Sequence, residues 1–288
     1  MSVLSVKNLI YGYSKGTPFE KGALKDVTLS FEEGAIVAVI GHTGSGKSTL
    51  LQHLNGLLKP DSGDVLFEDV SIYSSKEALH QCRFNVGLCF QYPEQQLFES
   101  TVYSDIAFGP TNMKLSQDEI DKRVRESLSF VGLTEDYLEK SPFDLSGGEK
   151  RRVAIAGVIS MRPKVLILDE PTAGLDPIGK NNLLKLIKAY NETTGSTVIF
   201  VSHNMDDVAA IAHKVIVMSD GKVAMEGTVD EVYSQGEKLS ELGLDIPEIT
   251  SVYLALKGAG YVTGDTAYTV EGAVDSILQS LKEGGKAL

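Results

Sequence analysis

Two kinds of hydrophobic pattern follow one another along the chain. Residues 1–34 alternate apolar and polar positions, with interruptions at Gly12, Gly16, Pro18 and Gly22. This alternation with turn residues predicts an antiparallel sheet. Continuous apolar runs follow at residues 35–40, 165–168 and 198–201, and helical segments separate these runs. Such runs are typical of strands that are buried on both faces of a parallel sheet.

A helical pattern separates the first two of these runs. It covers about residues 110–138 and contains a start signal at Ser116, with Ile120, Val124 and Leu128 on one face of the helix that follows. We predict that this pattern belongs to a helical subdomain over about residues 92–160.

The end of the chain has a different character. Residues 221–227 predict a hairpin, the pattern breaks near Gly236, and helices are expected to begin near Pro247 and Val270. We therefore predict a large domain over residues 1–235 and a small C-terminal extension over residues 236–288. Because short helices alone have little core, the extension should bury its apolar side chains against the large domain or a partner. These side chains are Ile246, Ile249, Val252, Leu254, Leu256, Ile277 and Leu281.

Composition limits the class of protein. The 288 residues are 42% hydrophobic and carry a formal net charge of −12, so a large core is expected and a broad nucleic-acid-binding surface is not. No apolar run approaches the ~18 to 20 residues of a membrane span, and residues 1–9 lack a signal peptide, which predicts a soluble cytosolic chain. Cys82 and Cys89 lack metal-ligand spacing and are expected to be buried, reduced thiols.

A complete phosphate-binding loop lies between a predicted strand and a predicted helix. Its glycines allow backbone N–H groups to turn inward around phosphates, and the helix directs its positive end at the same charge. Lys47 is expected to reach the β- and γ-phosphates, and Ser48 to offer a hydroxyl to Mg²⁺. A plain glycine-rich turn is the alternative, but the pattern arises by chance in only roughly one such chain in a hundred. The expected nucleotide ligands are Gly41, His42, Thr43, Gly44, Ser45, Gly46, Lys47, Ser48 and Thr49.

Two adjacent carboxylates, Asp169 and Glu170, end the apolar run at residues 165–168. At the carboxyl end of a parallel strand, Asp169 is positioned to hold Mg²⁺ through water, beside Ser48. Glu170 points to the other face and is a candidate to polarise the water that attacks the γ-phosphate. The alternative is that both acids only end the strand in solvent. The pair predicts nucleotide hydrolysis rather than binding alone.

A second candidate anion site occurs at residues 145–150, where the sequence reads Leu-Ser-Gly-Gly-Glu-Lys. Ser146 and Glu149 have the spacing of a helix capping box. Gly147 and Gly148 are poor helix formers, so stability alone does not account for them. Because they expose backbone N–H groups at a helix start, we predict that this segment binds phosphate and also caps the helix.

In this order, the three motifs resemble the nucleotide-binding subunits of ATP-binding cassette (ABC) transporters over about residues 1–235. The resemblance implies an α/β P-loop NTPase fold with a mostly parallel core sheet, an antiparallel β subdomain and a helical subdomain. It also implies ATP and Mg²⁺ as cofactors and head-to-tail pairing, in which the Ser-Gly-Gly helix of one chain closes over the ATP of the other. An isolated chain is then expected to be a poor ATPase.

The resemblance extends to single residues. Tyr13 matches the aromatic residue that stacks on adenine, although Tyr11 is close enough to compete and a structural tyrosine remains an alternative. Gln91 matches the glutamine that contacts Mg²⁺ and the attacking water, and Asp176 lies in the loop that crosses to the other chain. His203 matches the histidine that contacts the γ-phosphate. The other histidines are expected to be structural: His42, His53, His80 and His213.

Residues 91–98, 107–110, 149–157 and 243–250 look like the ATPases of energy-coupling factor (ECF) transporters and the related cobalt and nickel importers, over nearly the whole chain. This resemblance implies a peripheral subunit at the cytoplasmic face of the membrane that drives uptake of a vitamin or metal ion. Its implied partners are a second ABC ATPase, an integral membrane coupling subunit and a substrate-binding membrane subunit. Glu149 departs from the usual glutamine and favours a paralogous heterodimer over a homodimer.

Two other functions stay open at this point. One is a soluble ABC ATPase that acts on nucleic acid or ribosomes, although such proteins usually carry two cassettes or a coiled-coil insertion, and neither is seen here. The other is a regulatory nucleotide-binding module without turnover, which conflicts with the presence of Glu170 and His203. The importer ATPase is the leading interpretation, with no nucleic-acid partner.

Overall fold

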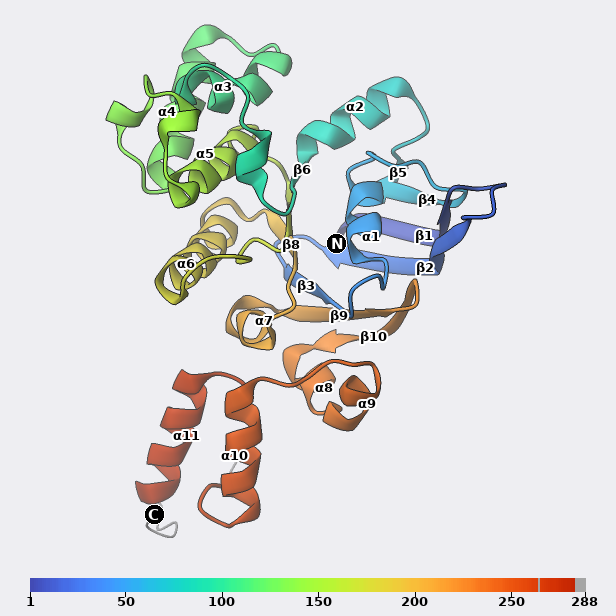
Figure 1. Ribbon diagram of the computed structural model, residues 1–288, viewed down its shortest axis with the longest axis vertical. Coiled ribbons are helices and arrows are strands. Elements are labelled where there is room, and N and C mark those ends of the chain that lie inside the picture. The colour runs from blue at the N-terminus through green and yellow to red at the C-terminus, as the bar shows by residue number, and fades with distance from the viewer. Residues whose placement is uncertain (264, 283–288) are drawn as a thin grey trace.

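The computed structural model describes residues 1–263 and 265–282, and its centre is a six-stranded sheet (Figure 1). The strand order is β10-β9-β3-β8-β7-β6. All neighbours pair in parallel except β9 and β10, which form the predicted hairpin. The strands are β3 (Ile36–Ile40), β6 (Val86–Cys89), β7 (Val165–Asp169), β8 (Thr197–Val201), β9 (Lys214–Ser219) and β10 (Lys222–Thr228). The predicted core strands are therefore confirmed.

An antiparallel sheet forms a second layer. Its order is β2-β1-β4-β5, and its strands are β1 (Ser2–Tyr13), β2 (Lys21–Glu32), β4 (Ser62–Phe67) and β5 (Val70–Ser71). Helix α1 (Lys47–Leu54) packs between the sheets, because Leu50, Leu51 and Leu54 join one core cluster with apolar residues of β1, β2 and β3. This packing holds the start of α1 at the carboxyl end of β3.

Helices cover the other face of the core sheet and continue into a separate lobe. Helices α6 (Pro177–Thr194) and α7 (Met205–Ile211) contribute to a second core cluster. The lobe contains α3 (Val102–Asn112), α4 (Gln117–Phe130) and α5 (Gly147–Ile159), drawn in green (Figure 1). As predicted, α4 follows Ser116 as N-cap and buries Ile120, Val124 and Leu128. Helix α2 (Lys76–Asn85) precedes β6.

Short 3₁₀ segments connect the elements of the lobe. They are η1 (Pro93–Gln96), η2 (Glu135–Tyr137) and η3 (Pro142–Asp144). Segment η1 follows β6 and leads into the lobe, so the carboxyl end of a core strand and the lobe are joined by only a few residues. Segment η1 therefore lies at the junction between the two regions.

The described residues of the C-terminal part, 229–263 and 265–282, form the helices α8 (Val229–Tyr233), α9 (Gly236–Glu241), α10 (Glu248–Gly258) and α11 (Val270–Lys282). Leu239 of α9 and Leu244 belong to the core of the large domain, whereas α10 and α11 form a cluster of their own around Tyr253. The cluster around Tyr253 is thus separate from the large core, which α9 joins through Leu239.

The apolar residues of the extension are only partly buried. Ile249, Leu256 and Ile277 pack against the Tyr253 cluster, and Ile246 packs against the large core. Val252 and Leu254 are exposed, so the large domain does not cover them, and cover by a partner stays a prediction. The side chain of Leu281 lies outside those that the structure describes.

Two further expectations concern the whole chain. Cys82 and Cys89 are free and buried, as predicted, and burial raises the pKa of each thiol to about 12. In residues 1–263 and 265–282, no helix is long and apolar enough to cross a membrane.

Candidate functional site

The loop between β3 and α1 has a backbone that only glycine accommodates at two positions. Gly41 has a φ of +151°, and an added Cβ would lie 2.2 Å from the Met218 carbonyl oxygen. Gly46 has a φ of +104°, and its Cβ would lie 2.6 Å from the Ala23 carbonyl oxygen. A Cβ at Gly44 would meet nothing within 4 Å. The loop therefore curls tightly against β9 and β2 and leaves its outer side open.

Lys47 lies at the start of α1 with its ammonium folded over this loop. Its Nζ donates to the carbonyl oxygens of Gly41 at 2.7 Å and His42 at 3.0 Å. Burial lowers the pKa of Lys47, while the nearby carboxylates of Glu170 and Asp169 oppose that shift. The charge of Lys47 thus sits between the loop and the two acids at the end of β7.

Asp169 is the last residue of β7 and is only 8% exposed. Burial raises the pKa of its carboxyl, and a hydrogen bond from the Ser48 hydroxyl opposes the shift. A buried carboxylate beside a hydroxyl provides the hard oxygen donors that Mg²⁺ prefers. Ser48 and Asp169, two of the three residues predicted to bind the metal, are therefore adjacent.

Three predicted catalytic side chains converge at the carboxyl end of the core sheet. Glu170 accepts a hydrogen bond from Gln91 Nε2 at 2.8 Å, and its other carboxylate oxygen lies 2.9 Å from His203 Nε2. Gln91 follows β6, Glu170 follows β7 and His203 follows β8. Because β6, β7 and β8 are parallel neighbours, their ends lie at one edge. The structure thus brings together residues that are far apart in sequence.

Glu170 also adopts an unusual backbone conformation. Its φ is +49°, in the left-handed region that non-glycine residues seldom occupy. Such conformations persist where the surrounding contacts hold them, and they concentrate at functional sites. Here the hydrogen bond from Gln91 and the contact with His203 hold the side chain.

A cavity of about 390 Å³ adjoins Glu170 and His203. Its wall includes Asp207, which is 1% exposed, accepts a hydrogen bond from the Thr172 hydroxyl at 2.8 Å and pairs with Lys180 at 2.5 Å. The loop after Glu170 is therefore anchored to α7 through Thr172, and the same Asp207 side chain joins α7 to α6 through Lys180. Sequence reasoning does not identify this anchor.

The two candidate adenine-stacking tyrosines differ in exposure. Tyr13 is 40% exposed, and its hydroxyl lies 3.1 Å from the hydroxyl of Thr49 on α1. The Tyr11 ring is less exposed and packs edge-on against His53, with 4.7 Å between ring centroids. Tyr13 thus has an exposed ring beside the phosphate loop, whereas the Tyr11 ring packs against His53.

The Ser-Gly-Gly segment lies apart from the phosphate loop of the same chain. Ser146, Gly147 and Gly148 are exposed at the start of α5 in the lobe, away from α1 (Figure 1). The predicted capping box is present. Asp176 is likewise part of a helix start, because its carboxylate accepts a hydrogen bond from the backbone N–H of Gly179 at 2.7 Å and caps α6.

Glu149 has more partners than a capping residue needs. Its carboxylate accepts hydrogen bonds from the Ser146 hydroxyl at 2.6 Å, the Ser146 backbone N–H at 2.8 Å and the Tyr137 hydroxyl at 2.6 Å. The bond from the Ser146 hydroxyl is the largest of the contributions that lower the pKa of Glu149 to about 2. The Glu149 carboxylate is therefore charged at neutral pH, and it accepts the hydrogen bond that the Ser146 hydroxyl donates.

Among the histidines expected to be structural, His53 and His213 form hydrogen bonds with backbone groups. His53 bonds the Thr49 carbonyl at 2.7 Å inside the domain, and His213 accepts from the Ile36 backbone N–H at 3.1 Å. His80 packs edge-on against Phe84. His42 remains in the phosphate loop, with its ring beside the Thr43 carbonyl.

The site as a whole fits a nucleoside triphosphate with a divalent cation. An open glycine loop, a lysine charge and a helix start face the space beside Ser48 and Asp169. Within residues 1–263 and 265–282, no group of three or more His, Cys, Asp or Glu could hold a metal ion. The hydroxyl of Ser48 and the carboxylate of Asp169 are oxygen donors that suit Mg²⁺, an ion that usually keeps several waters and also binds substrate phosphates.

These features define an ABC-type ATPase, and comparison with known proteins agrees. The ABC transporter family matches residues 24–173. The ECF transporter ATP-binding protein EcfA2 of Caldanaerobacter subterraneus subsp. tengcongensis is 50% identical over 279 residues, covering 97% of this chain and 98% of the relative. The EcfA2 protein of Clostridioides difficile is 50% identical over 287 residues, covering 99% of each chain.

Solved structures show the same fold. The structure of CbiO1 from Clostridium perfringens, part of the ABC transporter complex CbiONQ, gives a TM-score of 0.74 at 43% identity, covering 87% of this chain and 98% of that one. The cassette MJ0796, a dimer in a post-hydrolysis state with ADP and phosphate, gives a TM-score of 0.70 at 30% identity, covering 78% and 98%.

The chain therefore belongs to the ABC transporter family of ATP-binding and ATP-hydrolysing proteins. Within that family it is an ATP-binding protein of the ECF transporter type. The predicted fold and the resemblance to ECF ATPases are confirmed.

Proposed function

We propose that this chain is one of two ATPase subunits that pair in an ECF importer and couple ATP hydrolysis to uptake of a vitamin or a metal ion. The convergence of Gln91, Glu170 and His203 beside the phosphate loop carries this proposal, because hydrolysis needs a positioned base and a positioned γ-phosphate. The names of its relatives, all ECF transporter ATP-binding proteins, support the assignment to an importer.

Each residue of the convergence has a distinct role in this proposal. Glu170 accepts a proton from the attacking water, Gln91 orients that water, and His203 contacts the γ-phosphate. Lys47 neutralises charge on the β- and γ-phosphates. Stabilisation of this kind is mostly electrostatic and positional, since phosphoryl transfer needs little covalent chemistry from the protein.

The divalent cation is Mg²⁺ in this proposal, held by Ser48, Gln91 and, through water, Asp169. When bound, the ion would neutralise phosphate charge that develops during transfer. The adjacent hydroxyl and buried carboxylate support the assignment. The remaining nucleotide contacts come from the loop residues 41–49 and the ring of Tyr13.

Pairing of two ATPases completes each site. The exposed Ser146, Gly147 and Gly148 segment closes over the nucleotide of the other chain, and Asp176 lies in the crossing loop. The dimeric state described for MJ0796 supports this arrangement. We propose a paralogous partner rather than a second copy, because Glu149 adds negative charge beside the phosphate-facing segment of this chain.

The C-terminal extension, residues 236–288, is proposed as an additional pairing unit attached to the cassette of residues 1–235. Along α11, Val270, Val274 and Leu278 are spaced four residues apart and are 62%, 47% and 50% exposed. Such a stripe lies on one helix face and is costly to leave in water. The equivalent unit of the partner ATPase is the proposed cover.

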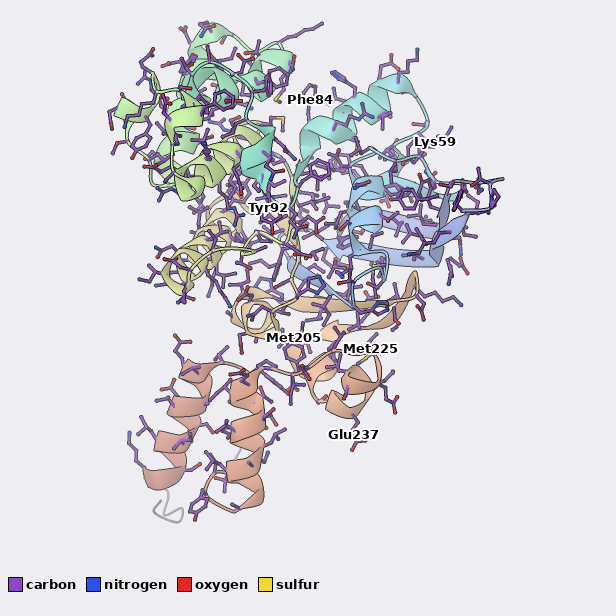
Figure 2. All side chains as sticks on the ribbon, viewed as in Figure 1. Lys59, Phe84, Tyr92, Met205, Met225 and Glu237 are labelled. Atoms are coloured by element: carbon purple, nitrogen blue, oxygen red, sulfur yellow. The ribbon has the colours of Figure 1, made fainter. Side chains whose placement is uncertain are left out.

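A membrane subunit is proposed to dock in a groove between α2 and the helical lobe. The groove has a volume of about 630 Å³ and is lined by residues of α2, α3, α5 and the segment between η1 and α3. Three phenylalanines contribute to it: Phe84, Phe98 and Phe108. Phe98 and Phe108 are 58% and 48% exposed and form an edge-to-face pair. Figure 2 shows Phe84 between α2 and the lobe. In this arrangement the chain is peripheral, at the cytoplasmic face, beside integral coupling and substrate-binding subunits.

No observation favours the alternative of an ABC ATPase that acts on nucleic acid or ribosomes. The relatives are transporter proteins, and the formal net charge of −12 would repel a polyanion. Co-purification of the chain with membrane proteins from detergent extracts would separate the two functions. Recovery with nucleic acid or ribosomes instead would contradict the importer assignment.

The central test is substitution of Glu170 by Gln in the assembled transporter. We expect ATP binding to be preserved and steady-state phosphate release to fall by at least ~10², the scale of losing a general base. The variant should also accumulate a closed ATPase pair, because hydrolysis no longer reopens it. Phosphate release close to wild type would show that Glu170 is not the base.

A further inference from the structure

We propose that Arg151 is a positioning residue that joins three moving parts of the ATPase: segment η1, helix α5 and the loop that follows Glu170. This inference rests on the proposed function. The guanidinium of Arg151 bonds Glu94, Pro171 and Ala173, so in this inference its role is to set the position of residues that bind ATP or take part in the chemical step.

Arg151 is buried at the junction of these parts, with 5% of the residue exposed. Its Nε and Nη2 donate to the two carboxylate oxygens of Glu94, at 3.2 and 3.3 Å. Its Nη1 donates to the carbonyl oxygens of Pro171 at 3.1 Å and Ala173 at 2.8 Å. One guanidinium on α5 therefore contacts η1 on one side and the loop after β7 on the other.

The geometry requires arginine in particular. A buried charge is costly unless it is paired and hydrogen-bonded, and here a carboxylate and two carbonyls satisfy it. The planar fork of a guanidinium binds a carboxylate with two nitrogens while a third points elsewhere. A lysine would keep the charge but could not reach both sides at once.

The loop held by Arg151 is the one that carries the proposed base. Residues 171–173 follow Glu170 directly, and the Ala173 backbone N–H donates to the Glu170 carbonyl at 3.1 Å. Thr172 is anchored to Asp207 on the far side. The loop is thus held between Arg151 and Asp207, and Glu170 keeps its left-handed backbone within this frame.

The segment formed by Gln91 and η1 is linked to Glu170 and its loop in two ways. Gln91 donates to the Glu170 carboxylate, and three residues later Glu94 pairs with Arg151. Between them, Tyr92 lies where the lobe meets the core (Figure 2). A displacement of η1 would therefore shift Glu170 by two routes. One is the hydrogen bond from Gln91, and the other is Arg151, which lies on the same helix as the Ser-Gly-Gly segment.

This arrangement predicts how the signal of partner docking is transmitted. Phe98, two residues after η1, lines the groove proposed for the membrane subunit. Occupation of that groove would shift η1, and the Glu94–Arg151 pair would carry the shift to α5 and to the Glu170 loop. Loss of the pair should therefore lower turnover in the complex and leave nucleotide binding unchanged.

The experiment uses four variants of the chain in the assembled transporter: Arg151→Met, Arg151→Lys, Glu94→Gln and the double variant Glu94→Gln/Arg151→Met. The matched control is Arg125→Met, because Arg125 also bonds two carboxylates in the same lobe but lies on its surface. Measured quantities are kcat and KM for phosphate release, and ATP affinity of the isolated chain. Glu170→Gln runs in parallel as the test of ATPase function itself.

We expect Arg151→Met to lower kcat by about tenfold or more, since small misplacements of catalytic groups have effects of this size or larger. KM and ATP affinity should change less than about twofold. Arg151→Lys should restore part of kcat, and Glu94→Gln should lower it about threefold. The double variant should match Arg151→Met, because the two residues act as one unit. Arg125→Met should behave like wild type.

Several results would overturn the inference. A wild-type kcat for Arg151→Met would do so, and so would independent, additive effects of the Glu94 and Arg151 substitutions. A loss of ATP affinity that tracks the loss of turnover would assign Arg151 a purely structural role. If Arg151→Met fails to fold, Glu94→Gln decides, and an unchanged kcat there rejects the link. Failure of the proposed function is distinct, because Glu170→Gln would then have no effect on turnover.

Discussion

Among single residues, Tyr13 has the surroundings expected of an adenine-stacking ring, and this leads to a direct test. The ring is exposed, and the hydroxyl lies beside Thr49, which follows Ser48. We expect Tyr13→Ala to weaken ATP binding by roughly 1 to 3 kcal/mol, by analogy with base stacking on aromatic side chains. Binding of ATP to the isolated chain, followed by calorimetry, measures this effect.

Two further substitutions sharpen the test. Tyr13→Phe keeps the ring and removes only the contact with Thr49, so it should retain most of the affinity. Tyr11→Ala removes the ring that packs on His53. If Tyr11→Ala weakens ATP binding and Tyr13→Ala does not, then Tyr11, and not Tyr13, stacks on adenine.

Glu149 leads to a second residue-level prediction. The carboxylate accepts the Ser146 hydroxyl proton, so a phosphate that needs this proton must compete with a negative charge. Glu149→Gln removes the charge and should lower KM for ATP in the assembled transporter, with a smaller effect on kcat. Phosphate release at varied ATP concentration separates the two parameters.

At neutral pH Glu149 should not be protonated, so the wild-type chain should not show the lower KM for ATP expected of Glu149→Gln. The hydrogen bonds depress the pKa of Glu149 to about 2, so their stabilising contribution is present above the ordinary glutamate pKa and is lost as pH falls towards the depressed value. Near pH 7 the carboxylate stays charged. A KM that is unchanged in Glu149→Gln would show that Ser146 does not depend on this carboxylate.

At the scale of elements, the sequence predicted what local patterns determine. Short stretches of sequence predict the core strands by their periodicity, the β9–β10 hairpin by its turn residues, and the start of α4 by the cap at Ser116. Packing across the chain leaves no such local pattern. Leu239 joins the large core although the sequence pattern breaks near Gly236, and nothing in the local pattern indicates that contact.

The candidate site divides in the same way. Gln91, Glu170 and His203 were predictable because each follows a strand or matches a motif. The Glu94–Arg151 pair was not, since the two residues are 57 positions apart and form no periodic pattern. Burial of Arg151 is visible only once α5 and η1 are packed together.

The groove between α2 and the helical lobe carries the prediction that belongs to this scale. Phe108→Glu removes the edge-to-face Phe98–Phe108 pair and places a charge beside the phenylalanines of the groove, where a docked partner would take it out of water. We expect co-purification with the membrane subunit to fall by about tenfold or more, the size of a hot-spot loss. ATP affinity of the isolated chain should not change, because the groove lies outside the nucleotide site.

Val70→Glu is the matched control, since Val70 is a similarly exposed apolar residue on the antiparallel sheet, at the β4–β5 hairpin. It should leave co-purification intact. Equal losses for Phe108→Glu and Val70→Glu would point to general destabilisation, and no loss for Phe108→Glu would place the membrane subunit elsewhere.

For the molecule as a whole, the C-terminal unit is the part whose role the cassette motifs do not explain. It has its own small core, with the Tyr253 hydroxyl bonded to Ser276 Oγ at 2.5 Å. One tie to the cassette is a hydrogen bond from the Tyr268 hydroxyl to Asp230 at 2.7 Å. A unit with so small a core gains stability from whatever covers its exposed side.

Removal of residues 247–288 should therefore separate pairing from nucleotide binding. The cut falls after Leu239 and Leu244, so it spares the core of the large domain. We expect the truncated chain to bind ATP normally as a monomer, while association of the ATPases weakens by about tenfold or more. Analytical ultracentrifugation of the ATPase pair measures the association.

A substitution on α11 tests the same idea without removing the unit. Val274→Glu charges the middle of the exposed stripe, and Asp275→Ala changes the adjacent exposed position without charging the stripe. If the stripe meets the partner ATPase, Val274→Glu should weaken pairing almost as much as truncation, because a charge would be buried there unpaired, and Asp275→Ala should not. Pairing that survives both Val274→Glu and the truncation would mean that the cassettes associate without this unit, and that its apolar face serves another partner.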